Sequence, residues 1–293
     1  MSTRKWIIAA VAVLLGLCVL LAVVAVPRTP AAQTADVAIL MYHAFTEDEA
    51  DTGSLYTPAS EFARQLSALR DAGYTSVGYA DLIEFVNGEG KLPEKPLLIS
   101  IDDGYQNNLD LAAPLLETYG FCANIAVIGV SIGHTTYKDT DIPITPHFSL
   151  EDARPWIERG VLTVTTHSYD MHQVAAVDGD DCRRGVLQMP GEAEPDYIAA
   201  LTQDYTRAQE QLAGLPGTPL PVFTYPFGAY SELSERVLQA LGVQVTVTTE
   251  GGANRLVKGE PETLRLLRRI HVWHGTKPDM LLSRIDGALQ ALR

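Results

Sequence analysis

The stretch PLLISIDDGY, residues 96–105, joins a run that is apolar apart from Ser100 to two adjacent acids and a glycine. A short apolar run without polar alternation is typical of a strand that is buried on both faces of a parallel sheet. Asp102 and Asp103 then stand at the carboxyl end of that strand. Two ionised neighbouring carboxylates repel each other, and a divalent cation relieves the repulsion. The stretch therefore predicts a buried strand that delivers acids to a metal site, with an ordinary turn as the alternative.

Strand-like and helix-like segments alternate along the rest of the chain. Strands are predicted at 37–42, 74–77, 96–101, 121–130, 161–166, 221–224, 243–248 and 266–275, and helices at 58–72, 81–86, 105–118, 149–159, 195–212 and 231–241. Such alternation predicts an α/β fold with a parallel sheet, most naturally a closed or nearly closed (β/α) barrel. In such barrels the active site lies at the C-terminal ends of the strands.

Polar residues suited to catalysis follow four of these strands. They are His43, Asp102, Asp103, His167, His172 and the segment YPFG at 225–228. In the stretch THSYDMH, residues 166–172, the two histidines are five positions apart, which suits neither one face of a helix nor one face of a strand. The chain must turn between them for both to bind one metal. Two histidines and one aspartate leave positions open on a metal, as a catalytic site requires.

These motifs together resemble those of a known family. ISIDDGY (99–105), THSYDMH (166–172) and YPFG (225–228) are similar, in order and spacing, to the three motifs of the polysaccharide deacetylases, carbohydrate esterase family four. The resemblance runs from about Val37 to near the C-terminus. It implies the NodB-homology fold, a deformed (β/α) barrel. It also implies metal-dependent hydrolysis of acetyl groups from N-acetylated glycans, and occasionally from O-acetylated ones.

The resemblance also implies roles for single residues. Asp102 corresponds to the catalytic base, and Asp103, His167 and His172 correspond to the metal ligands. The five-residue histidine spacing and the N-terminal segment ILMYHAF, residues 39–45, resemble the poly-N-acetylglucosamine deacetylase subgroup, which makes His43 the expected general acid. The alternatives are a structural role for His43 and an acid at His271 or His274, which lie in LLRRIHVWHG, residues 266–275.

The third motif departs from the family pattern. Thr224 occupies the place of an arginine that orients the base, and the family's fourth motif is not located, so the partner of Asp102 stays open. The backbone amide of Phe227 is expected to hold the oxyanion, with Tyr225 beside it. Trp273 is expected to contact the sugar, or to pack in the core. The departures leave a catalytically degenerate, glycan-binding barrel as an alternative.

The N-terminal segment is predicted to be a membrane anchor. The run from Ile7 to Val26 contains no charged residue and no proline, and it is long enough to span a bilayer. Arg4 and Lys5 precede it. A cleaved signal peptide is the alternative, and it would make the protein secreted. The expected organisation is a cytoplasmic n-region at 1–5, a transmembrane signal anchor at 6–26, a linker at 27–35 and an extracytoplasmic catalytic domain at 36–293.

The amino-acid composition limits the kinds of partner that the protein can bind. The net charge of −14 argues against a nucleic-acid partner, which would need basic patches. Of the three cysteines, Cys18 lies in the apolar run, and a disulfide between Cys122 and Cys182 is left open. The sequence thus predicts a single-pass hydrolase of the cell membrane that N-deacetylates an N-acetylhexosamine polymer, such as poly-N-acetylglucosamine, a chitin-like glycan or peptidoglycan. It predicts one divalent metal, with zinc first and iron, cobalt, nickel or manganese as alternatives. An O-acetyl ester substrate is the other enzymatic alternative.

Overall fold

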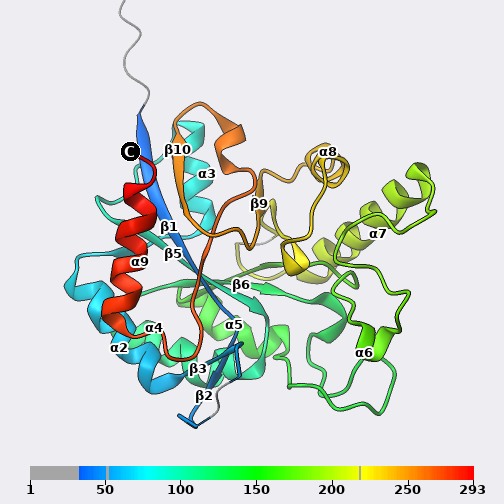
Figure 1. Cartoon of the computed structure of the whole chain (residues 1–293), viewed down its shortest axis with the longest axis horizontal. Helices are drawn as coiled ribbons and strands as arrows, with labels where there is room; N and C mark the ends of the chain where they lie inside the picture. The colour runs from blue at the N-terminus through cyan, green and yellow to red at the C-terminus, as the bar shows by residue number, and fades with distance from the viewer. Residues whose placement is uncertain (1–32, 51–52, 218) are drawn as a thin grey trace, which may run out of the picture. The chain divides into compact units, whose positions relative to one another are not determined.

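Two neighbouring parallel strands, β1 (Thr34–Tyr42) and β5 (Pro96–Asp103), lie side by side in the main sheet of the computed structural model (Figure 1). Their register pairs Ala38 with Leu97 and Tyr42 with Ile101. All eight residues of β5 are buried, as are the last six of β1. Because both faces of these strands are covered, their sequences lack polar alternation.

The structure describes residues 33–50, 53–217 and 219–293. The predicted n-region and anchor lie outside these residues, as does the predicted linker up to residue 32. Thr34–Arg293 forms one compact unit, and β1 begins inside the range predicted as linker. Among the described helices, none combines the length and the apolar character needed to cross a bilayer.

The main sheet follows the order β10-β1-β5-β6-β7-β8-β9, with β11 also beside β1 and β4 beside β5. Its other strands are β4 (Thr75–Ser76), β6 (Ala123–Val127), β7 (Leu162–Thr166), β8 (Val222–Thr224), β9 (Val245–Val247), β10 (Ala253–Val257) and β11 (Ile270–His271). All of its pairs are parallel except that of β1 with β10. The predicted parallel α/β sheet is confirmed, in the form of a curled half-barrel. A single bridge between Val247 and Leu267 joins β9 to the segment that leads into β11.

Helices cover the sheet from several sides (Figure 1). They are α2 (Ala59–Asp71), α3 (Tyr79–Asn87), α4 (Ala113–Tyr119), α5 (Leu150–Glu158), the short α6 (Ala175–Asp178), α7 (Glu194–Leu212), α8 (Glu232–Ala240) and α9 (Pro278–Gln290). Side chains of α2, α4, α5 and α9 share one core cluster with β1, β5, β6 and β7. Helix α3 packs in a second cluster, and α7 and α8 pack in a third around β8.

Several boundaries differ from those predicted. The predicted helix at 105–118 begins as a π-helix, Asn108–Ala112, in which the buried Asn108 donates from Nδ2 to the backbone oxygen of His43 at 2.7 Å. Strand β10 was not predicted because its sequence, ANRLV, mixes polar and apolar residues. Thr57 and Pro58 lie in a two-strand parallel sheet of β2 (Ala44–Thr46) and β3 (Tyr56–Pro58), and Pro58, predicted as the first helical residue, is instead the N-cap of α2. Cys122 and Cys182 are free thiols and form no disulfide.

The period of two along β5 divides its side chains between two faces. Leu97, Ile99 and Ile101 belong to the cluster under α2 and α4, whereas Leu98 belongs to the cluster with α3. Ser100 and Asp102 continue the Leu98 face toward the carboxyl end of the strand. Asp102 is therefore directed to the inner side of the curled sheet.

Candidate functional site

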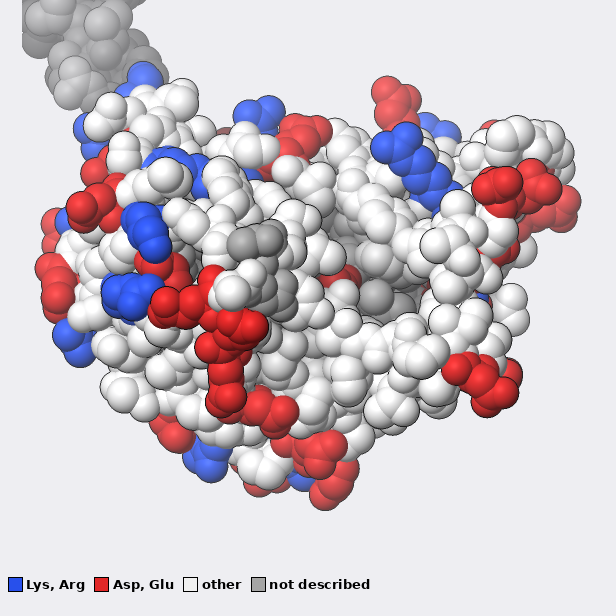
Figure 2. All heavy atoms as spheres, turned by 60° about the horizontal axis from the view of Figure 1, so that its bottom comes forward, with Lys and Arg blue, Asp and Glu red and all other residues white. Residues whose placement is uncertain are grey.

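Three predicted metal ligands meet at the carboxyl ends of β5 and β7. Asp103, His167 and His172 each place one ligand atom within 4.8 Å of the others. Asp103 Oδ1 lies 3.7 Å from His167 Nε2 and 3.6 Å from His172 Nε2. Figure 2 views the lower edge of Figure 1, where the face is hollowed near its middle and acidic side chains gather beside the hollow. The sequence thus placed these three residues together correctly.

Asp103 leaves the β5 pleat because its backbone turns. Its φ of 75° lies in the left-handed region, which a non-glycine residue seldom adopts. Gly104 follows with φ 88°, and a Cβ there would lie 2.8 Å from Val127 Cγ1 on the neighbouring strand. Only glycine fits this turn. The DDG sequence therefore lets the consecutive carboxylates of Asp102 and Asp103 point in different directions.

The His167 ring is fixed by a backbone carbonyl. Its Nδ1 lies 2.8 Å from the Thr224 oxygen at the end of β8, and because a carbonyl only accepts, Nδ1 carries the proton and donates. Burial lowers the pKa of His167 to about 4, with His172 contributing in the same direction. The imidazole is therefore neutral, and its Nε2 lone pair faces Asp103, as metal ligation requires.

The loop after His167 explains the five-residue spacing. Ser168 has φ 74°, which reverses the chain direction. Asp204 on α7 then accepts from the Tyr169 N–H at 2.8 Å and from the Asp170 N–H at 2.7 Å. Burial raises the pKa of Asp204 to about 6, although these two N–H groups favour its charged form. A carboxylate from a distant helix thus holds the turn that brings His172 to Asp103.

The side chain of Asp170 points elsewhere. It binds Lys138 Nζ at 2.7 Å and is 40% exposed. The contact that orients an imidazole of the trio is that between His167 Nδ1 and the Thr224 carbonyl, and Asp170 takes no part in it.

The three side chains fit a divalent metal ion. Asp103 Oδ1 is buried and accepts no hydrogen bond, although an unpaired buried acceptor costs roughly 1–3 kcal/mol. Ligand atoms on one tetrahedral zinc, at about 2.0–2.2 Å from it, lie roughly 3.3–3.6 Å from each other. The two distances from Asp103 Oδ1 are close to this spacing.

Asp102 has a buried arginine partner that the sequence interpretation missed. Arg269, fully buried just before β11, donates from Nη1 to Asp102 Oδ1 at 2.7 Å and to Ser100 Oγ at 3.0 Å. Its Nε donates to the Thr248 oxygen at 2.7 Å. Burial by itself raises the pKa of Asp102, but Arg269 and the nearby histidines outweigh it and hold that pKa well below its usual range. Arg269 is thus the partner of Asp102 that the third motif, with Thr224 in place of an arginine, leaves open. The only clue in the sequence was an arginine pair inside an apolar run.

Of the three histidines considered as the acid, His43 is the one in contact with Asp102. Its Nε2 is 3.9 Å from Asp102 Oδ2. The His271 ring packs edge-on against the His43 ring, with centroids 5.8 Å apart. His274 lines a separate pocket with Glu61 and Lys277.

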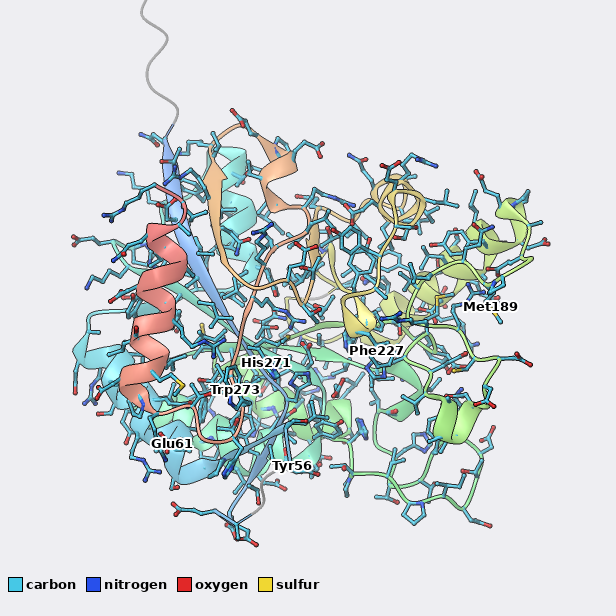
Figure 3. The ribbon with its side chains drawn as sticks, in the orientation of Figure 1. Tyr56, Glu61, Met189, Phe227, His271 and Trp273 are labelled. Atoms are coloured by element: carbon cyan, nitrogen blue, oxygen red, sulfur yellow. The ribbon has the colours of Figure 1, made fainter. Side chains whose placement is uncertain are left out.

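The residues predicted to contact substrate differ in their placement. Phe227 is 42% exposed at φ 58°, and its ring lies 4.2 Å from the His172 ring (Figure 3). In the described part of the chain its N–H has no acceptor. Trp273 is 36% exposed, with the Arg284 guanidinium 4.3 Å from its ring centre. The prediction for Tyr225 is wrong, because this side chain is fully buried, its hydroxyl donates to Glu235 at 2.6 Å and its N–H is paired.

Comparison with known proteins agrees with this geometry. The family model described as polysaccharide deacetylase matches residues 89–246. YxkH of Bacillus subtilis (strain 168), whose name assigns it to the polysaccharide deacetylases, is 27% identical over 215 residues, which cover 73% of this chain and 65% of YxkH. The poly-beta-1,6-N-acetyl-D-glucosamine N-deacetylase of Escherichia coli (strain K12) is 21% identical over 226 residues, 73% of this chain and 34% of that protein. The chain therefore spans under two thirds of YxkH and about one third of the Escherichia coli protein.

The fold has a close counterpart among solved structures. A de-N-acetylase from Aggregatibacter actinomycetemcomitans superimposes with a TM-score of 0.73 at 18% identity, covering 85% of this chain and 100% of that one. This likeness concerns the fold alone. Since the family model covers more than half of the chain, the protein belongs to the polysaccharide deacetylase family.

Proposed function

We propose that this protein is a metal-dependent hydrolase that removes N-acetyl groups from an N-acetylhexosamine polysaccharide. The observation that carries the proposal is the trio Asp103, His167 and His172, which converges beside the arginine-paired Asp102. The Escherichia coli relative supports an amide bond of poly-N-acetylglucosamine as the target. Chitin-like glycans and peptidoglycan carry the same acetamide group.

Asp103 Oδ1, His167 Nε2 and His172 Nε2 are the atoms that would hold the metal. A divalent ion with open positions supplies Lewis acidity, which polarises an acyl carbonyl and lowers the pKa of water. Zinc suits a ligand set of two imidazoles and one carboxylate, and iron, cobalt, nickel and manganese accept it too.

The remaining chemistry falls to side chains of this chain. Arg269 occupies Asp102 Oδ1, so Oδ2 is the oxygen that takes the proton from the attacking water. His43, on the same side of Asp102, donates a proton to the departing nitrogen. The Phe227 N–H donates to the oxygen on which charge develops. Acetate and a free amino sugar are the products.

Acetate release tests this proposal. Purified protein loaded with zinc, cobalt or manganese should release acetate from N-acetylglucosamine oligomers, and chelation should stop the release. Acetate release from an O-acetylated xylan at the same concentration, compared with release from the N-acetylated oligomers, tests the ester alternative. A protein that binds glycan but releases no acetate, either with any of these metals or in metal-free buffer, would instead be the degenerate barrel. That alternative rested on the third-motif arginine and on the fourth motif, and the pairing of Arg269 with Asp102 counts against the first of these reasons.

His43→Gln tests the assignment of the general acid. We expect kcat to fall by about 10²–10⁴-fold with KM little changed, because the leaving nitrogen loses its proton donor. His271→Gln is the matched control, since His271 packs against His43 but lies outside the Asp102 contact. A larger loss in the His271 variant would transfer the acid role to that residue.

Asp204→Asn tests the support of the metal loop. The amide group presents a donor to one of the two N–H groups, so one hydrogen bond is lost and His172 is held less firmly. We expect the affinity for zinc to fall by about 10–100-fold, the usual effect of removing a group that orients a ligand. Asp170→Asn is the control, because its exposed pair with Lys138 contributes little. Zinc titration with a chromophoric chelator measures both, and equal affinities would contradict the role of Asp204.

The protein is also proposed to act outside the cytoplasm on an uncleaved N-terminal anchor. The support is the uncharged run from Ile7 to Val26 behind Arg4 and Lys5. Membrane fractionation of the full chain, with protease added to intact cells, tests it. A protease-protected catalytic unit or a soluble, shortened product would overturn it.

A further inference from the structure

His43 stands at a break between two strands. β1 ends at Tyr42 and β2 begins at Ala44, so His43 is the single residue that separates them, at the carboxyl end of β1 (Figure 1). From this point the chain leaves the main sheet, because β2 pairs with β3 instead. His43 itself belongs to neither strand. The direction of its side chain therefore depends on the groups that fix the chain at this break.

Among the described residues, no hydrogen bond orients the His43 ring. Its Nδ1 is buried and has no partner, and its Nε2 lies 3.9 Å from Asp102 Oδ2, which is beyond the length of a hydrogen bond. The ring of His271 packs edge-on against it. His167 differs in this respect, because the Thr224 carbonyl orients its ring. The place of His43 Nε2 is therefore set by its backbone and by packing.

Two consecutive asparagines hold that backbone. Asn108, which is fully buried, donates from Nδ2 to the His43 oxygen at 2.7 Å. Asn107 accepts on Oδ1 from the Phe45 N–H at 3.0 Å. The two amides also contact each other, since Asn108 Nδ2 lies 3.3 Å from Asn107 Oδ1. The chain is thus held at His43 itself and again two residues later.

Asn108 stands in a widened helical turn directly after β5. Its backbone oxygen accepts from the Ala113 N–H, the fifth residue after it, as in a π-helix. Single π-turns are rare and frequently occur at functional sites. The same short segment of chain begins with Asp102 and Asp103. The side chain beside His43 Nε2 and the support of the His43 backbone therefore come from one segment.

Asn108 is a poor choice for stability alone. Its Oδ1 is buried and accepts no hydrogen bond, and an unpaired buried acceptor destabilises the folded state. Its neighbours Leu109 and Ala112 lie in the apolar core, where an apolar side chain would pack without that loss. The strong bond from Nδ2 to His43 is what the asparagine adds. This bond indicates a role in placing His43.

We propose that Asn107 and Asn108 are positioning residues that keep His43 within reach of the departing nitrogen. The inference rests on the proposed deacetylase function, in which His43 donates the proton to that nitrogen. An amine leaves only when it is protonated, whereas a nitrophenolate leaves without a proton. The two asparagines thus determine how well the site cleaves amides, and they have little effect on its cleavage of activated esters.

Two substrates that differ in their leaving group test the pair. In Asn108→Leu, and in Asn107→Leu at a less buried position, kcat for N-acetylglucosamine oligomers should fall by about 10–100-fold with KM little changed, because the acid is misplaced. Hydrolysis of 4-nitrophenyl acetate should stay close to that of the wild type. Asn107→Asp keeps an acceptor for the Phe45 N–H and should retain amide hydrolysis.

Gln106→Leu is the matched control, since the Gln106 side chain binds Asp110 at the surface. It should leave the hydrolysis of both substrates unchanged. Equal losses on the amide and the ester in the asparagine variants would indicate damage to the whole site and would overturn the positioning role. Full activity on both substrates would overturn it as well.

A double variant shows whether the asparagines act through His43. Asn108→Leu added to His43→Gln should cause no further fall in kcat, because the group that Asn108 places is already absent. A further fall as large as that in the wild-type background would mean that Asn108 acts independently of His43, and it would refute the proposal.

The NMR signal of the His43 ring tests its placement without catalysis. In the full chain, this signal is identified by its loss in His43→Gln. It should shift in Asn108→Leu and Asn107→Leu, whereas the signal of the exposed His134 should not. If the wild type releases no acetate from any N-acetylated oligomer, the proposed function fails. A shifted His43 signal would then still support the placement of this ring by the asparagines, and an unshifted one would overturn it whatever the activity.

Discussion

Arg269→Met is expected to remove most of the activity and much of the stability. Asp102 would be left buried without its guanidinium partner, and breaking a buried pair from one side costs about 3–5 kcal/mol. Protonation would relieve the buried charge, so Asp102 could no longer accept a proton. We expect kcat/KM to fall by about 10²–10⁴-fold. Acetate release and denaturant unfolding measure the two effects.

The neighbouring arginine provides the control. Arg268 is 55% exposed and lies 3.5 Å from Glu250, so Arg268→Met removes a surface pair worth at most about 1 kcal/mol. Arg269→Lys should recover only part of the loss, because a lysine cannot bind Asp102, Ser100 and the Thr248 carbonyl together. If Arg268→Met and Arg269→Met behave alike, Arg269 has no special role.

A double variant isolates the charge pair. Arg269→Met with Asp102→Asn removes both charges, so the free energy of unfolding should be higher than that of Arg269→Met alone. A simple sum of the two single losses would contradict a direct interaction.

The pH dependence has a definite sign. The depressed pKa of Asp102 means that its ionised form stabilises the folded protein above the ordinary carboxyl range, and that this contribution is lost as the pH falls through the folded pKa. Without Arg269, burial is no longer outweighed and the pKa rises. The acid limb of the kcat/KM profile should therefore move to higher pH in Arg269→Met. An unmoved limb would assign it to another group.

The contrast between Arg269 and the three predicted metal ligands shows what the sequence can reveal. Asp103, His167 and His172 interrupt apolar strands at their ends, and a parallel sheet brings strand ends together. Arg269 is 167 residues from Asp102 in the chain. Its neighbour Arg268 looks equivalent in the sequence, and only the register of the segment before β11 directs one inward and the other to solvent. The meeting of Asp103, His167 and His172 was therefore predictable, whereas the partner of Asp102 was not.

The same limit applies to local geometry. The sequence showed that the chain must turn between His167 and His172, but Asp204, which fixes this turn, is one acid among several on α7. YPFG was recognised as a motif, yet the buried position of Tyr225 depends on Glu235 of α8. Strand and helix types followed from periodicity. The directions of single side chains followed from tertiary contacts.

Asp103→Asn is expected to abolish metal binding at the site of Asp103, His167 and His172 while leaving the fold intact. The amide keeps the size of the side chain but loses the charge that favours a cation between His167 and His172. Zinc affinity should fall by at least about 100-fold, beyond the usual effect of removing an outer group. In the wild type, zinc at 100 times its Kd should raise the free energy of unfolding by about 2.7 kcal/mol, and in the variant the rise should nearly disappear.

Asp110→Asn, an exposed acid whose partner is Gln106, is the matched control and should behave as the wild type does. Cobalt loading adds a second readout, because its visible absorption reports the ligands directly. The wild-type spectrum should change on mutation of Asp103 and stay the same on mutation of Asp110. Zinc stabilisation that survives in Asp103→Asn would place the metal elsewhere, and Asp102 would then have to be reconsidered as its ligand. Because Arg269 already binds Asp102 Oδ1, we do not expect Asp102 to replace Asp103 as the ligand, and zinc should not stabilise the variant.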